Sequence, residues 1–153
     1  MHFDAPTLFV ATIAANLSML LLVFALAWIR KRPANRLFAA AFLASQLGFI
    51  VYLVFSRTRQ APLLVAAILL LFAFYVLLVA GMRCYFELKP WPRHLVALLA
   101  AALVLIPFFT LVLDSYTFRT LSFAILSVVM ISSSIRPILH QISNRKHLRL
   151  VYL

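Results

Sequence analysis

The sequence predicts an all-α integral membrane protein, a bundle of five transmembrane helices joined by short loops. Its 153 residues are 66% hydrophobic and only 11% charged, whereas a soluble domain carries about 25% charged residues. Five apolar runs are each long enough to cross a hydrocarbon core of about 30 Å as a helix, and they lack the alternation of membrane-barrel strands. The formal charge of +11 is divided among short clusters between these runs, which indicates topology determinants and argues against a nucleic-acid-binding face.

The first predicted span covers residues 8–29, which contain no ionisable side chain. Arg30, Lys31, Arg32 and Arg36 follow it, whereas the residues ahead of it include one acid and no lysine or arginine. Because basic residues accumulate on the cytoplasmic side, this asymmetry predicts an amino terminus outside and a basic cluster in the cytoplasm. The flanks are the reverse of those of a cleaved signal peptide, so the helix is expected to be retained.

The other four spans are predicted from apolar runs at residues 37–55, 62–82, 95–113 and 116–135. With the first span they form a transmembrane domain over residues 1–135. The longest loop inside this domain is residues 83–94, where Pro90 and Pro92 prevent a helix from continuing.

Residues 136–153 are predicted to form a basic cytoplasmic tail that begins next to Pro137. The tail ends in the apolar run Leu-Arg-Leu-Val-Tyr-Leu. This run has two interpretations: the start of a sixth helix truncated at Leu153, or a short amphipathic segment on the inner leaflet.

The distribution of lysine and arginine supports the predicted orientation. The expected inner segments hold eleven of the 14 basic residues, including Arg83, Lys89 and Arg93, and the outer segments hold only Arg57, Arg59 and Arg119. We therefore expect a multi-pass protein of the bacterial inner membrane, with the lipid bilayer as its partner and anionic lipid at the cytoplasmic face. Arg119 is expected to snorkel outward from the first turn of the last span.

The spans lack the groups that catalysis or ion-coupled transport require. No Asp, Glu, Lys, Arg or His lies near the middle of a span, and such residues mark ion and proton pathways. The single cysteine, Cys84, excludes an intramolecular disulfide. Metal ligation and haem binding are not expected, because all four histidines lie at boundaries or in loops: His2, His94, His140 and His147. The sequence therefore predicts no enzyme activity, no cofactor and no metal site.

Three polar residues at mid-depth are the candidate ligand-binding residues. Asn16 lies in the first span, Gln46 in the second and Ser127 in the fifth. Asn16 and Gln46 are the candidates for a small polar pocket that meets a ligand, and the alternative for all three residues is ordinary hydrogen bonding between helices, worth about 0.6 kcal/mol each. Pro107 interrupts the fourth span and is a hinge candidate, because proline frees a backbone carbonyl and kinks a helix.

Several segments resemble the amino-terminal membrane region of bacterial diguanylate cyclases (GGDEF proteins). Residues 3–8 (Phe-Asp-Ala-Pro-Thr-Leu) precede a span and a basic stop, and residues 35–43 (Asn-Arg-Leu-Phe-Ala-Ala-Ala-Phe-Leu) are similar to the entry of the family's second span. Residues 80–92 contain Gly-Met-Arg, Phe and Pro-Trp-Pro, which look like its inner loop. Residues 108–112 (Phe-Phe-Thr-Leu-Val), followed by Arg119, resemble its outer corner.

The resemblance implies a sensory or anchoring module of a signalling protein that acts as a homodimer or with a membrane partner. The Gly-Gly-Asp/Glu-Glu-Phe turn that binds GTP in the family does not occur in this chain, so no catalytic output is expected from it. Two other functions stay open. One is a structural subunit of a membrane complex, for which small residues on the fourth span suit close packing, namely Ala97, Ala100, Ala101 and Ala102. The other is a small transporter that carries a neutral solute past Asn16 and Gln46.

Overall fold

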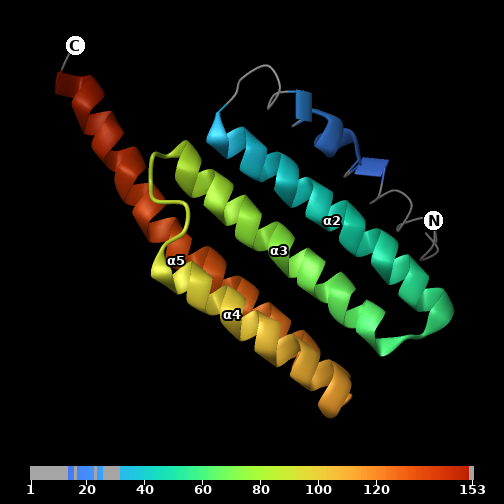
Figure 1. Ribbon diagram of the computed structural model, residues 1–153. Helices are drawn as coiled ribbons and strands as arrows, with labels where there is room; N and C mark the ends of the chain where they lie inside the picture. Colours follow the sequence, from blue (N-terminus) through green and yellow to red (C-terminus); the bar gives the residue numbers. More distant parts are fainter. Residues whose placement is uncertain (1–13, 16, 23, 26–31, 152–153) are drawn as a thin grey trace, which may run out of the picture.

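The described part of the protein is helical, as the composition predicts. The computed structural model describes residues 14–15, 17–22, 24–25 and 32–151, with side chains up to residue 143, and no strand occurs among these residues. The helices are α2 (Pro33–Thr58), α3 (Ala61–Tyr85), α4 (Arg93–Pro107), the π-helix η1 (Phe108–Val112) and α5 (Tyr116–Val151) (Figure 1).

Four helical segments are long and apolar enough to cross a membrane: Pro33–Thr58, Ala61–Tyr85, Arg93–Val112 and Tyr116–Ser143. They correspond to the last four predicted spans, and by length and composition they indicate a helical, multi-pass membrane protein. The first predicted span, residues 8–29, lies partly outside the described residues. Its described positions are helical, and Ser18 Oγ donates to the carbonyl of Ala14 at 2.9 Å as on a helix surface. The five-span count therefore stays a prediction.

The second and third spans are longer than predicted at both ends. Helix α2 begins at Pro33, because proline suits the first turn, where its missing N–H costs no hydrogen bond. It ends where Arg59 adopts a left-handed φ of 58° and donates its N–H to the carbonyl of Phe55 at 2.7 Å. Helix α3 starts two residues later and continues to Tyr85. The predicted loop of residues 83–94 thus shortens to residues 86–92, where Glu87 also has a positive φ, of 62°.

The fourth predicted span, residues 95–113, consists of two kinds of helix. Regular α-helix ends at Pro107, and a wider π-helical turn follows, closed by the N–H of Leu113 on the carbonyl of Phe108 at 3.2 Å. Proline has no N–H for the carbonyl four residues earlier. Thr110 Oγ1 donates to the carbonyl of Ile106 at 2.6 Å, a buried side-chain bond next to this change of winding.

Helix α5 corrects the prediction for the carboxyl-terminal residues. The fifth span was expected over residues 116–135 with a separate tail after it, but α5 continues from Tyr116 through Pro137 to Val151. Residues 136–151 are therefore continuous with the fifth helix, and their place in the cytoplasm stays a prediction. Pro137 has no N–H to donate to the carbonyl of Ser133, four residues earlier. The chain is nevertheless helical both before and after it.

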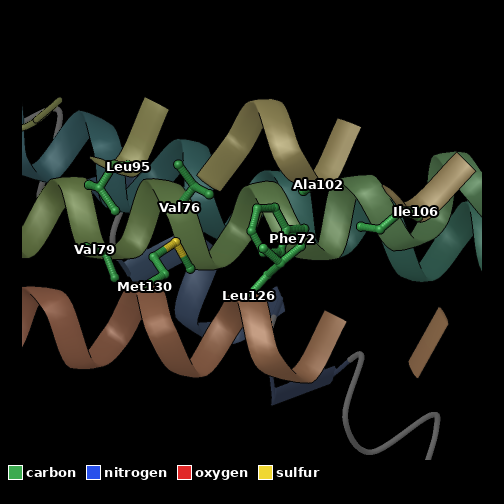
Figure 2. Close-up of a cluster of buried hydrophobic side chains, with 8 residues drawn as sticks. All are labelled: Phe72, Val76, Val79, Leu95, Ala102, Ile106, Leu126 and Met130. Carbon is green, nitrogen blue, oxygen red and sulfur yellow. The ribbon is translucent and has the colours of Figure 1, made fainter. Parts of the chain in front are cut away.

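Helix α3 is the centre of the described bundle. It contacts α2 on one side and α4 and α5 on the other, whereas α2 contacts none of the other described elements (Figure 1). The core lies where α3, α4 and α5 meet (Figure 2). Its buried side chains are Phe72, Val76, Val79, Leu95, Ala102, Ile106, Leu126 and Met130. In Figure 2 the residue numbers of the labelled core residues increase in the same direction along α3 and along α5, so these two helices run parallel.

Small residues form the seam between α2 and α3. Ala41, Ser45 and Gly48 are buried on α2, and a Cβ atom added to Gly48 would lie 3.3 Å from the carbonyl oxygen of Ala67. At the other end of the seam, a Cβ atom on Gly81 would lie 2.8 Å from the ring of Phe38. Close backbone approach of this kind is the usual basis of helix packing in membranes. Lipid tails are as apolar as the side chains, so the hydrophobic effect does not drive the helices together and van der Waals packing does.

Candidate functional site

A cavity of about 490 Å³ opens between α2, α3 and α5 at the end of the bundle that holds the α2–α3 turn. Helix α3 lines its inner side with the apolar residues Leu64, Ala67, Ile68 and Leu71. The last turns of α2 and the first turns of α5 form its two walls. We call this space the arginine cavity, because Arg59 of α2 and Arg119 of α5 both line it.

Backbone geometry places both arginines at the mouth of the cavity. Arg59 is held in the two-residue turn by its left-handed conformation. Arg119 is in the first turn of α5, where its N–H donates to the carbonyl of Ser115 at 3.1 Å. The Arg119 guanidinium carbon lies 5.5 Å from the ring centre of Tyr116, within the range of a cation–π contact. Arg119 is half-buried, and its outward snorkelling stays a prediction.

The described residues that line the arginine cavity supply basic and hydroxyl groups and no acidic group. Its polar lining consists of Arg59, Arg119, Tyr52, Tyr116 and Thr120. The Arg119 guanidinium makes a cation–π contact with Tyr116, another lining residue. The cavity is therefore electropositive, and an anion is the chemically complementary occupant.

The inner end of the cavity adjoins the hydrophobic core. Phe123 lines the cavity and packs edge-to-face on two residues of α3, with ring centres 6.1 Å from Phe72 and 6.0 Å from Tyr75. Phe72 is fully buried in the core. A molecule in the arginine cavity would therefore contact Phe123, whose ring is part of the packing between α3 and α5.

The structure places two of the predicted ligand-binding residues, Gln46 and Ser127, on helices that do not meet. Gln46 is buried on α2 and Ser127 on α5, and these two helices have no contact with each other in the described bundle. Asn16 lies outside the described residues. The Ser127 hydroxyl is buried and has no hydrogen-bond partner in the described part of the chain. Ser127 therefore lies apart from Gln46, because α3 separates their helices, and the predicted pocket of Asn16 and Gln46 stays a prediction.

The predicted topology determinants gather at the opposite end from the arginine cavity. Arg32 is the N-cap of α2, and with Cys84 and Glu87 it lines a smaller cavity of about 230 Å³ beside the end of α3. Arg83 is buried, and its Nε donates to the carbonyl of Lys89 at 3.0 Å.

Arg36 lies in the first turns of α2, and Arg93 begins α4, whereas Arg30 and Lys31 are outside the described residues. This separation of the two ends agrees with the predicted alternation of loops. The orientation in the membrane stays a prediction.

Two further sequence candidates have a defined place. Pro107 marks the change from α-helix to π-helix, and its role as a hinge stays a prediction. Ala102 is buried in the core, whereas Ala97 and Ala100 are exposed, so part of the alanine run packs inside the bundle. No group of three or more potential metal ligands occurs among the described residues.

Sequence reasoning missed the arginine cavity. It treated Arg59 and Arg119 as incidental charges on the expected outer side. The available signal was that these residues, with Arg57, depart from the rule that basic residues stay in the cytoplasm. A charge retained on the wrong side of a membrane protein is a candidate for a binding role.

The fold and this cavity define a class: a multi-pass helical membrane protein with an electropositive cavity at one end. No protein-family model, curated protein or solved structure matches the sequence.

Proposed function

We propose that the protein is a sensory module of the bacterial inner membrane, in which occupation of the arginine cavity displaces α5. The observation that carries this proposal is that a single helix, α5, lines the cavity with its first two turns and continues to Val151. At 1.5 Å per residue its 36 residues extend for about 54 Å, whereas the hydrocarbon core is about 30 Å thick. Figure 1 shows α5 reaching past the other helices at the end away from the α2–α3 turn.

The charge distribution and the resemblance to diguanylate cyclases support the direction of signalling. With the amino terminus outside, the arginine cavity faces the extracytoplasmic side and the extension of α5 enters the cytoplasm. In the resembling proteins a cytoplasmic output domain follows a helical membrane region. Because α5 is continuous from the cavity to its cytoplasmic extension, no loop lies between them to absorb a rotation or a shift of its first turns.

The test is an insertion series in α5. A diguanylate cyclase catalytic domain is fused after Leu153, and one to seven alanines are inserted after Ser143, beyond the last candidate membrane residue. Each alanine rotates the following helix by about 100°, so two rotate it by about 200° and seven return it to within about 20° of the start.

We expect cyclic di-GMP production to change with two alanines and to return with seven. A seven-residue Gly/Ser insertion is the matched control, because it adds the same length without a fixed rotation. A production rate that is uniform across the alanine series would refute the proposal that α5 transmits a signal.

A further inference from the structure

We infer that the arginine cavity binds an amphiphile that carries an anionic head group, a carboxylate or a phosphate, on an acyl chain. The inference names the ligand class of the sensory module and rests on that proposed function for the ligand's role as a signal. Binding itself is independent of it and follows from the charge, polarity and position of the lining residues.

The charge of the cavity selects an anion. Arg59 and Arg119 line one space, and none of the other described residues that line it is acidic. Each guanidinium keeps its positive charge at any ordinary pH, so the two together give this end of the cavity a fixed positive charge. Arginine presents a planar set of donors that matches a carboxylate or a phosphate, and such charge-assisted pairs are frequently bidentate.

The polarity along the cavity selects an amphiphile over a free anion. The arginines lie at the turn and in the first turn of α5, whereas Leu71 and Phe123 lie deeper in the bundle. From Leu64 to Leu71 the lining of α3 extends over about 10 Å of helix. An inorganic anion would leave this apolar wall in contact with water, and an uncharged lipid would leave both guanidinium groups unpaired.

The position of the cavity suits entry from the bilayer. It lies among helices that are candidate membrane spans, at their ends. A lipid in the adjoining leaflet has its head group at the level of the helix ends and its chain at the level of the apolar side chains. The order of polar and apolar groups in the cavity therefore matches the orientation that such a molecule already has. Its volume of about 490 Å³ lies within the range of small-molecule sites.

The test measures binding of spin-labelled lipids to the full chain in neutral phosphatidylcholine nanodiscs. Stearate and phosphatidylglycerol are the two anionic arms, methyl stearate is the uncharged arm, and inorganic phosphate is added as a competitor without a chain. We expect stearate, phosphatidylglycerol or both to bind more tightly than methyl stearate, with little competition from phosphate. The arm that binds distinguishes a free carboxylate from a phospholipid as the source of the head group.

Substitutions at the arginines test the site. Arg59→Gln and Arg119→Gln are each expected to weaken binding of the anionic lipid about tenfold, equivalent to about 1.4 kcal/mol. Arg57→Gln is the matched control, because Arg57 is an exposed arginine in the last turn of α2 that does not line the cavity. Arg59→Lys keeps the charge and is expected to bind with intermediate affinity, which separates loss of the site from loss of folding.

Filling the cavity provides a test that leaves both arginines in place. Thr120→Trp introduces a large side chain at a lining position, whereas Thr117→Trp places it at an exposed position outside the lining. We expect the first variant to lose binding of the anionic lipid and the second to retain it.

Three results would overturn the inference. They are equal binding of stearate, phosphatidylglycerol and methyl stearate, equal losses for the variants at Arg57 and Arg59, and full displacement by inorganic phosphate. If the anionic lipids fail to bind selectively but the alanine insertions still change cyclic di-GMP production periodically, only the proposed ligand class is refuted. If cyclic di-GMP production is uniform across the alanine insertions but the anionic lipids bind selectively, only the proposed sensory function is refuted.

Discussion

Replacement of Phe72 by alanine tests the packing on which the bundle depends. Phe72 is fully buried on α3, between α4 and α5, and its ring contacts that of Phe123 edge-to-face at 6.1 Å. In water such a substitution costs 3–5 kcal/mol or so, part of which is transfer of the ring from solvent. In a bilayer most of the transfer contribution vanishes, because lipid is as apolar as the core.

What is left is the cavity and the lost ring contact. A deleted phenyl ring leaves a space of roughly 100 Å³, which at about 24 cal/mol per Å³ lowers the free energy of unfolding by about 2.4 kcal/mol. The edge-to-face pair adds about 0.5–1.5 kcal/mol. We therefore expect Phe72→Ala to destabilise the bundle by about 3 kcal/mol.

The assay is reversible unfolding of the full chain in mixed micelles with increasing sodium dodecyl sulfate, followed by circular dichroism. Phe118→Ala is the matched control, because Phe118 is 53% exposed and its ring stacks on Phe109 at 5.7 Å without being enclosed. It should cost about 1 kcal/mol or less, since only the stacking contact is lost. Equal losses for the two variants would refute the reasoning that α3, α4 and α5 share a packed core.

Two further outcomes follow from the helix contacts. Gly48→Leu should destabilise the bundle by about 1–3 kcal/mol in the same unfolding assay, because even its first carbon would lie 3.3 Å from the Ala67 carbonyl; an unchanged midpoint would contradict the close α2–α3 seam. Pro107→Ala should restore regular α-helix after position 107, because it removes the residue that lacks an N–H. Amide hydrogen exchange at residues 108–112 should then slow, and unchanged exchange there would mean that the π-helical turn has another cause.

Apolar runs predicted the described spans well because the requirement for them is local. Any segment of about 20 apolar residues in a bilayer must satisfy its backbone hydrogen bonds within itself, so it is a helix wherever its neighbours lie. The ends were less predictable, since helices continue beyond the apolar run when nothing stops them. Pro33 permits an early start for α2, and Pro137 does not end α5.

The candidate site was not predictable in the same way, because it depends on which helices are neighbours and how they are rotated. Gln46 and Ser127 have the same polarity and similar depth, yet α3 lies between their helices. The arginine cavity joins residues far apart in sequence, such as Arg59 and Arg119. The hydropathy pattern indicates how far along its span each residue lies. It does not indicate how the spans are arranged around one another.

The segment of residues 86–92 divides the described bundle into two hairpins. Helices α2 and α3 are joined by only two residues, and η1 and α5 by three, so each pair is a tightly connected hairpin. Glu87, exposed and with a positive φ, offers a place for a glutamate-specific protease to cut between them. The two fragments would each retain a complete hairpin, and the buried contacts of α3 with α4 and α5 would hold them together. The protein is therefore suited to being expressed as two pieces that reassemble in the bilayer.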